Sequence, residues 1–307
     1  MSGAPTIAIL GPGGVGGLLA AALARTGADV VVVAREQTAR TIAREGIAVE
    51  SSALGDFTAH PRAVARLERP VEALIVATKA AGLEEALARV DVSAPRVVVP
   101  LLNGFDHMAL LRERFGARVA AGTIRVQADR LPDPPARVVQ RGTFLSVELA
   151  SADPALRTTL ASLAGLLERA GVTTRVRDDE ARILWGKLVR LNALACTTAA
   201  YDATFGAIRA DPERRAALEG CVREGAAVAR AEGAQIDPEV VFGEFEVIHD
   251  GFGTSMQRDV AAGRVPELDA IAGAVLRAGA RHGVACPTIA TLAARVAERA
   301  GVPAPAV

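Results

Sequence analysis

The sequence has little of what disulfide scaffolds and metal sites require. It contains three cysteines, Cys196, Cys221 and Cys286, which are odd in number, far apart and without a CxxC pair. We therefore expect buried thiols in a reducing cytoplasm rather than disulfides. The four histidines show no ligand spacing, so no metal site is expected.

An excess of charge of one sign is also lacking. The 35 basic and 35 acidic residues balance and are spread along the chain, which argues against nucleic-acid and membrane-surface partners. Residues 7–24 are uncharged, but five glycines and one proline interrupt them. No Lys or Arg precedes this segment, so we expect neither a spanning helix nor a signal peptide.

The chain length favours two domains. Half of the 307 residues are hydrophobic, enough for a large core. Apolar runs at 6–10, 29–34, 73–78 and 96–102 alternate with helical patterns, which predicts a doubly wound, mostly parallel α/β sheet. Residues 118–149 predict a small antiparallel extension, in which the alternating stretch 137–149 follows the turn-rich segment 129–136. Helical spacing prevails from Asp153 onward. We expect an α/β domain over 1–178 and an all-α domain over 179–307.

A glycine motif follows the first strand. Gly11, Gly13 and Gly16 form GxGxxG between a strand and a helix, where glycines allow a tight turn, approach of a pyrophosphate and close helix packing. The free amides at the helix start, including those of Gly14 and Val15, favour an anion. A purely structural glycine turn is the alternative, but the order of strand, loop, helix and strand favours a dinucleotide-binding Rossmann domain.

The second strand ends in an arginine rather than an acid. Arg35 follows Ala34 there, and an arginine at this place pairs with a 2'-phosphate, which favours NADP over NAD. The alternative is that Arg35 is an exposed loop charge and that Glu36 binds the ribose.

Polar residues follow two further strands. Lys79 and Asn103 come after the third and fourth apolar runs, at the edge where ligands bind to such sheets, so both are candidates for contact with cofactor and substrate. A solvated lysine and an ordinary Asn-Gly turn at Asn103 and Gly104 are the alternatives.

The helical part holds three more candidates. Lys187 lies at the margin of a stripe formed by Leu184, Leu188, Leu191 and Ala195, with Arg190 expected toward solvent. Lys187 could simply extend to water. Glu267 is expected in the first turn of a helix near Pro266, where the dipole alone would explain it, and Ser255 could belong to a helix cap.

These residues together carry a resemblance. The glycine loop, Arg35, Lys79, "NG" at 103–104, "LWGKL" at 184–188, "SMQRD" at 255–259 and "PELDAI" followed by "ARHGVACPT" resemble the ketopantoate reductase family over essentially the full chain.

The resemblance implies a cytoplasmic enzyme of pantothenate biosynthesis that reduces 2-dehydropantoate to pantoate with NADPH. It implies that Lys187 donates the proton and that Glu267 positions it or holds a substrate hydroxyl. Lys79 and Asn103 would contact cofactor and substrate, and Ser255 would bind substrate. A positive charge near the developing oxyanion agrees with this chemistry.

Three positions depart from the family pattern. Leu191, Ala195 and Phe252 stand where members often carry asparagine, and Asn192 is one residue out of place on the helix. A less polar ketone or 2-oxo acid is therefore an alternative substrate. A non-catalytic NADP-binding sensor is an alternative of another class. A homodimer is possible, since alanine-rich helix faces suit dimerisation as well as internal packing.

Overall fold

The computed structural model describes residues 5–131 and 136–306, so part of the turn-rich segment expected at 129–136 lies outside the described residues. The chain divides into two compact units, which are described separately below. The first comprises residues 1–102 and 107–180, and the second comprises residues 103–106 and 181–307. The short segment 103–106 thus belongs with the helices that follow much later in the sequence.

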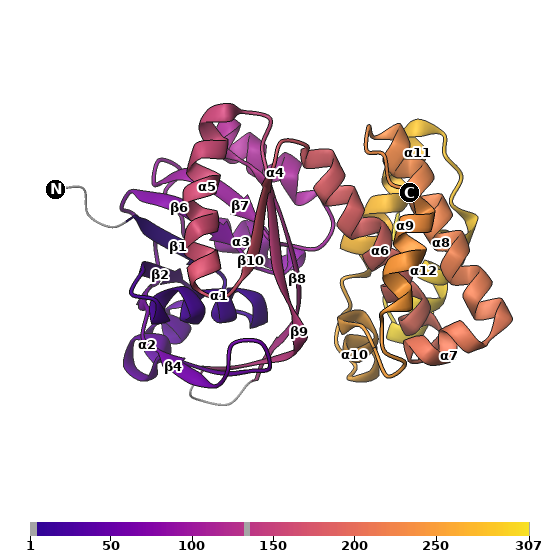
Figure 1. Ribbon diagram of the computed structural model, residues 1–307, viewed down its shortest axis with the longest axis horizontal. Coiled ribbons are helices and arrows are strands. Elements are labelled where there is room, and N and C mark those ends of the chain that lie inside the picture. The colour runs from indigo at the N-terminus through magenta and orange to yellow at the C-terminus, as the bar shows by residue number, and fades with distance from the viewer. Residues whose placement is uncertain (1–4, 132–135, 307) are drawn as a thin grey trace. The chain divides into compact units, whose positions relative to one another are not determined.

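A parallel five-stranded sheet forms the base of the first unit (Figure 1). Its strands, in spatial order, are β5 (Arg62–Val64), β2 (Asp29–Val33), β1 (Thr6–Leu10), β6 (Val71–Val76) and β7 (Pro95–Pro100). The four predicted strands are confirmed, and β5 is an addition. Chain order reverses between β1 and β6, which is the switch point where doubly wound sheets bind ligands.

A second sheet completes the unit. It consists of β3 (Ile47–Ser51), β4 (Phe57–Ala59), β8 (Ala121–Arg130), β9 (Ala136–Ala150) and β10 (Thr173–Arg177). The antiparallel pair of β8 and β9 agrees with the expected extension, but β9 also pairs in parallel with β3 and β10. β10 is an exception to the helical spacing that prevails from Asp153 onward, because its neighbour on the sheet outweighs its local pattern.

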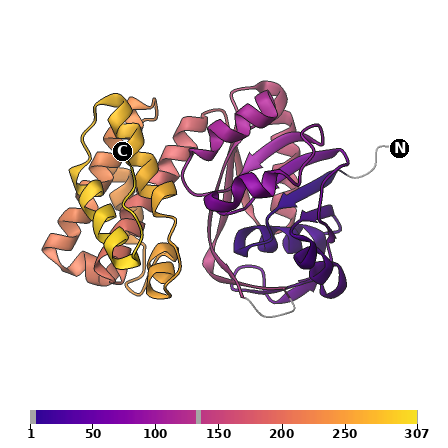
Figure 2. The ribbon, with the colours of Figure 1, turned by 180° about the vertical axis from the view of Figure 1, so that it is seen from behind.

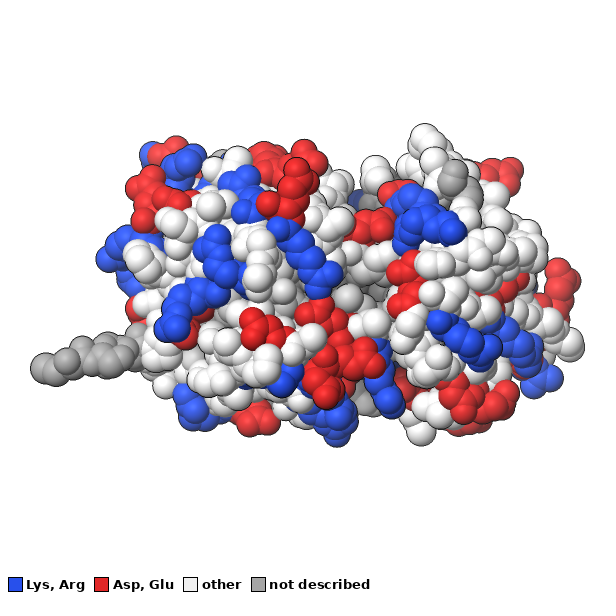
Figure 3. Space-filling model, turned by 90° about the horizontal axis from the view of Figure 1, so that it is seen from above, with Lys and Arg blue, Asp and Glu red and all other residues white. Residues whose placement is uncertain are grey.

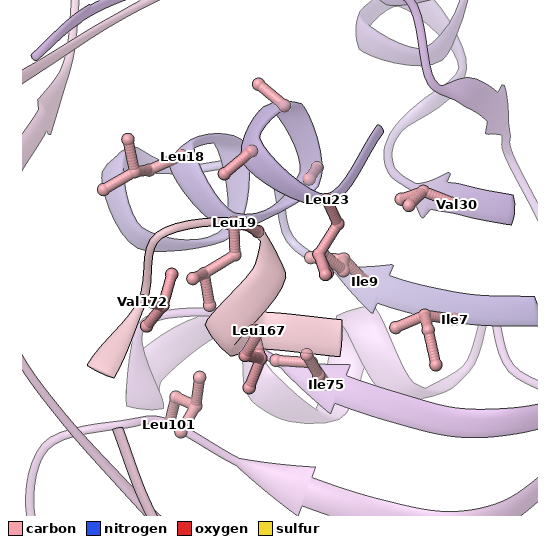
Figure 4. Close-up of a cluster of buried hydrophobic side chains, with 14 of the residues drawn as sticks. Ile7, Ile9, Leu18, Leu19, Leu23, Val30, Ile75, Leu101, Leu167 and Val172 are labelled. Atoms are coloured by element: carbon pink, nitrogen blue, oxygen red, sulfur yellow. The ribbon is translucent and has the colours of Figure 1, made fainter. Parts of the chain in front are cut away.

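Two helices lie between the sheets. α1 (Gly14–Arg25) packs against β2 on one side and β8 and β9 on the other, and α5 (Pro154–Arg169) packs against β7 and β10. Figure 4 shows Leu19 and Leu23 of α1 directed toward Ile9 and Leu167. The burial of these side chains fixes the start of α1 against β1, which positions the glycine loop.

The described part of the first unit has five further helical segments. They are α2 (Glu36–Glu45), the short turn η1 (Ala80–Gly82), α3 (Leu83–Leu87), α4 (His107–Phe115) and η2 (Gly116–Arg118). α4 packs against β7, and Figure 2 shows this side of the sheet.

The second unit is helical around its own core. Its helices are α6 (Glu180–Tyr201), α7 (Phe205–Ala210), α8 (Pro212–Ala231), α9 (Pro238–Glu246), α10 (Ser255–Ala261), η3 (Asp269–Gly273), α11 (Ala274–His282) and α12 (Pro287–Ala300). Three of them begin at the proline of an Asp-Pro or Cys-Pro pair, and proline at the first helical position needs no amide partner. η3 is a π-helical turn, a form that is rare and often lies at functional sites. Within the described residues, no helix combines the length and apolar character needed to cross a membrane.

Candidate active site

The glycine loop has the geometry that a bound pyrophosphate requires. Gly11 adopts φ +90°, and a methyl group placed on it would lie 2.7 Å from the Thr78 side chain after β6. A methyl group on Gly16 would lie 2.1 Å from the Gly11 carbonyl oxygen. Both glycines are therefore required by the close approach of backbone and neighbouring strand.

Gly13 is different, because the space around it is open. Apart from the adjoining residues, no atom lies within 4 Å of a methyl group placed on Gly13. Its φ of −75° is also one that any residue can adopt. The Thr78 hydroxyl, beside the loop, is buried and makes no hydrogen bond among the described residues. Open space over Gly13 and an unsatisfied hydroxyl nearby fit a ligand that lies on the loop.

Arg35 lies at the carboxyl edge of the same sheet, as the N-terminal cap position of α2. It forms a bidentate ion pair with Glu85 of α3, with N–O distances of 3.2 and 2.8 Å. The hydrogen bond and charge of Glu85 raise the pKa of Arg35, and Arg35 in turn lowers the pKa of Glu85. Because both side chains are largely exposed, an incoming phosphate can compete for the guanidinium.

Two neighbours of Arg35 bear on the cofactor prediction. Arg40 pairs with Glu36 one turn away on α2, so Glu36 is engaged by an arginine. Lys79 is exposed and precedes η1, three residues after the end of β6. Gly14 and Val15 form the first turn of α1, as the motif predicts.

Asn103 and Glu267 meet in the second unit. The Asn103 amide Nδ2 donates a hydrogen bond to Glu267 Oε2 at 3.0 Å, and the pair is partly buried. Gly104, the next residue, adopts φ +75°, and a methyl group on it would lie 2.0 Å from the Ala270 carbonyl oxygen in η3. The Asn-Gly pair is therefore a docking element on the helix that follows Glu267, and not only a turn.

Further contacts hold this segment, residues 103–106, in place. The Phe105 and Trp185 rings lie 4.9 Å apart between centroids. Arg277 of α11 donates to Asp106 at 2.6 Å and to Asp269 at 2.7 Å. These contacts connect the segment to α6, η3 and α11, and the sequence alone gave no signal for them.

Lys187 shares a half-buried face of α6 with Leu184 and Leu191, while Trp185 and Leu188 face the core. The apolar stripe is thus rotated from the predicted one. The expectation for Arg190 was wrong, because its side chain is 23% exposed and lies 3.5 Å from Glu244 of α9.

The positions that depart from the family pattern are packing residues. Asn192 is fully buried and hydrogen-bonds the thiols of Cys196 and Cys221 at 3.3 and 3.4 Å. Ala195 is buried, and Leu191 and Phe252 pack against the core of the helical unit. Asn192 therefore has a structural role, because its amide is hydrogen-bonded to buried thiols of the helical core.

Ser255 is the exposed first residue of α10. The capping side chain is that of Thr254, which accepts from the Gln257 amide and lies 2.8 Å from the Thr198 hydroxyl. Thr254, and not Ser255, therefore caps α10. The Ser255 hydroxyl lies in the first turn of this helix.

Comparison with known proteins places the chain. The family model for ketopantoate reductase PanE/ApbA matches residues 7–153, and the model for its C-terminal part matches residues 179–300. The chain belongs to the ketopantoate reductase family. It is 33% identical to the 2-dehydropantoate 2-reductase of Caulobacter vibrioides, over 94% of this chain and 97% of that one. The corresponding protein of Halobacterium salinarum is 28% identical over 96% of this chain and 99% of its own.

Solved structures agree. That of 2-dehydropantoate 2-reductase from Geobacter metallireducens GS-15 superimposes with a TM-score of 0.85 at 28% identity, covering 95% of this chain and 99% of that one. A ternary structure of D-mandelate dehydrogenase with NADH and anilino(oxo)acetate has the same TM-score of 0.85 at 23% identity, over 96% and 98% of the two chains, and shows the shared fold. The chain is accordingly an oxidoreductase that acts on a carbonyl and alcohol pair of a small molecule.

Proposed function

We propose that this ketopantoate reductase family member reduces 2-dehydropantoate to pantoate with NADPH, with Lys187 as proton donor. One observation carries the proposal beyond family membership. The chain has only two lysines, Lys79 and Lys187, among its 35 basic residues. A chain that solvates its surface with arginine has no general need for lysine, whereas only lysine can give up its proton near neutral pH. Both lysines stand at positions that the family motif assigns to the site.

The glycine loop supports a nicotinamide dinucleotide as cofactor, and Arg35 supports NADPH. The open space at Gly13 admits a pyrophosphate, and the amides that begin α1 are oriented to bind it. Arg35 already binds the Glu85 carboxylate in a bidentate manner, and a guanidinium can bind a 2'-phosphate in the same geometry. Glu85 would give up this pairing when NADPH binds.

When bound, a nicotinamide cofactor would supply the hydride for the carbonyl carbon of the substrate. As negative charge develops on the carbonyl oxygen, the Lys187 ammonium stabilises it and transfers a proton, which leaves the alcohol and a neutral amine. Glu267, oriented by Asn103 at 3.0 Å, would position Lys187 or hold a substrate hydroxyl. Ser255 would bind substrate, and Lys79 and Asn103 would contact cofactor and substrate.

A different 2-oxo acid is the second candidate substrate. Leu191, Ala195 and Phe252 offer no amide at the places where the family often has asparagine, and Asn192 is buried with the cysteines. A site with fewer polar donors discriminates less in favour of a hydroxylated substrate. A less polar 2-oxo acid or ketone is the occupant that these side chains favour.

The proton-donor role is tested with variants that separate charge from proton transfer. Lys187→Ala should lower turnover about tenfold or more with NADPH affinity unchanged. Lys187→Arg keeps the charge but holds its proton, so it should lose turnover as well. Arg182→Ala on the same helix is the matched control, because Arg182 is exposed. An undiminished rate in Lys187→Ala would remove Lys187 from the mechanism.

The same assay separates the enzyme from a sensor. A non-catalytic NADP-binding sensor would bind NADPH but oxidise it with none of the 2-oxo acids offered. Turnover with any of them would exclude that alternative.

A further inference from the structure

The end of β8 lies directly on the glycine loop. A methyl group placed on Gly14 would stand 2.1 Å from the Ala128 carbonyl oxygen. Two residues further, Arg130 Nη1 donates a hydrogen bond to the carbonyl oxygen of Pro12, between Gly11 and Gly13, at 3.2 Å. A guanidinium from the second sheet therefore stands at the loop where a dinucleotide would bind.

The backbone holds Arg130 at this place. Asp129 and Arg130 pair with Val139 and Val138 of β9, and the Arg141 guanidinium lies 3.0 Å from Asp129 Oδ2. The register of β8 and β9 shifts between Val126 and Gln127, and such irregularities redirect the side chains beyond them. The position of the guanidinium thus follows from strand pairing rather than from a free loop.

Arg130 supplies a positive charge that the glycine loop itself lacks. Residues 11–16 contain no basic side chain, and a pyrophosphate carries two negative charges. Desolvation lowers the pKa of Arg130, but an arginine stays protonated at neutral pH. Its guanidinium has several N–H donors, so it can bind Pro12 and still donate to a ligand oxygen.

We propose that Arg130 binds the pyrophosphate of the dinucleotide and is a cofactor-binding residue of this site. This inference rests on the proposed function, because it assumes a dinucleotide on the glycine loop. It assigns the second sheet a role in binding, while Arg35 serves the 2'-phosphate at the edge of the first.

Four ligands test the assignment in calorimetric titrations of the full chain. NADPH, NADH and ADP-ribose all carry the pyrophosphate, whereas 2'-AMP carries a phosphate but no pyrophosphate. Arg130→Gln should weaken the first three by a similar factor of about ten or more, because a charge-assisted hydrogen bond is lost. Affinity for 2'-AMP should be unchanged, and Arg130→Lys should restore part of the lost affinity.

Arg96→Gln is the matched control. Arg96 lies at the amino end of β7, away from the carboxyl edge of the sheet, and pairs with Glu72 at 3.3 Å. Arg96→Gln removes the same charge as Arg130→Gln and should leave the affinities for all four ligands unchanged. Both variants should unfold cooperatively on heating.

Each other outcome overturns the assignment. Unchanged ADP-ribose binding in Arg130→Gln would show that Arg130 does not touch the pyrophosphate. A loss confined to NADPH would move it to the 2'-phosphate, and an equal loss for 2'-AMP would show a structural effect. A wild-type chain that binds none of the dinucleotides would defeat the proposed function itself, a result distinct from failure of Arg130 alone.

Discussion

Asn103 donates a hydrogen bond to Glu267 across 164 positions of the sequence, at 3.0 Å. The two residues come from a strand-end segment and from the start of a helical turn, and neither has a local reason to meet the other. The bond engages Oε2 of the carboxylate and so fixes its orientation. The segment that carries Asn103 therefore acts as part of the helical unit that contains Lys187.

Figure 3 shows positive and negative side chains interspersed over the face that it presents, with no broad field of one sign. This distribution agrees with the balanced composition and with a small-molecule substrate.

Gly104→Ala should disrupt the docking of residues 103–106. The substitution places a methyl group 2.0 Å from the Ala270 carbonyl oxygen at a φ of +75°. The free energy of unfolding should fall by roughly 2 kcal/mol or more, measured by urea denaturation. Gly283→Ala is the control, since it has φ +66° and open space, and should show only the smaller cost of the left-handed backbone. Equal losses in both variants would contradict the docking role.

Gly13→Ala and Gly16→Ala should separate binding from stability. Alanine at Gly13 meets no atom within 4 Å, so the melting temperature should stay within about 2 °C, while NADPH affinity should fall about tenfold or more. Alanine at Gly16 meets the Gly11 carbonyl oxygen at 2.1 Å and should lower the melting temperature itself. Unchanged affinity in Gly13→Ala would place the pyrophosphate elsewhere.

Arg35 and Glu85 should set cofactor preference in opposite directions. Arg35→Gln should raise the KM for NADPH about tenfold or more and leave that for NADH nearly unchanged, because only NADPH has the 2'-phosphate. Glu85→Gln should lower the KM for NADPH, since the competing carboxylate of the 2.8 Å pair is removed. Steady-state kinetics with both cofactors measures the ratio. An equal rise in the KM for NADH would show that Arg35 does not bind the 2'-phosphate.

The three cysteines should make the fold sensitive to alkaline pH. Burial raises the pKa of Cys196 to about 12 and that of Cys286 to about 11, from 9.0, and raises that of Cys221 as well. Raised folded pKa values mean that this contribution to stability is fully present below about pH 9 and is lost as the pH rises toward 11 and 12.

Urea denaturation between pH 8 and pH 11 measures this loss, and a Cys196→Ala variant should lose part of the dependence. Native protein at pH 8 should also react slowly with Ellman's reagent, because Cys196 and Cys221 are fully buried and protonated. Rapid reaction of all three thiols in the native protein would contradict this arrangement.

Much of the first sheet was predictable because its strands are buried on both faces. Runs such as residues 30–34 are continuously apolar, as is typical of a central parallel strand that is buried on both faces. β3 and β10 have short alternating patterns and depend on β9 as their neighbour, so local sequence did not reveal them. The glycine loop was predictable because the motif spacing follows a strand, and because Gly11 and Gly16 each have a separate steric reason.

The candidate site was predictable only as a set of residues. Motif order indicated Asn103 and Glu267, but their hydrogen bond depends on the docking of Gly104 against η3, which no local pattern encodes. Arg190 was misplaced because helical periodicity ignores Glu244 on the neighbouring helix. Arg130 was not indicated by any local pattern, since its contact with Pro12 comes from a strand that returns to the loop more than a hundred residues later.

We propose that this chain reduces 2-dehydropantoate with NADPH. The most direct measurement is the initial rate of NADPH oxidation with 2-dehydropantoate, beside a panel of less polar 2-oxo acids and with NADH as the cofactor control. We expect efficient turnover of 2-dehydropantoate and a preference for NADPH. Turnover of another 2-oxo acid in its place, or of none, would contradict the substrate assignment while leaving the family and the fold intact.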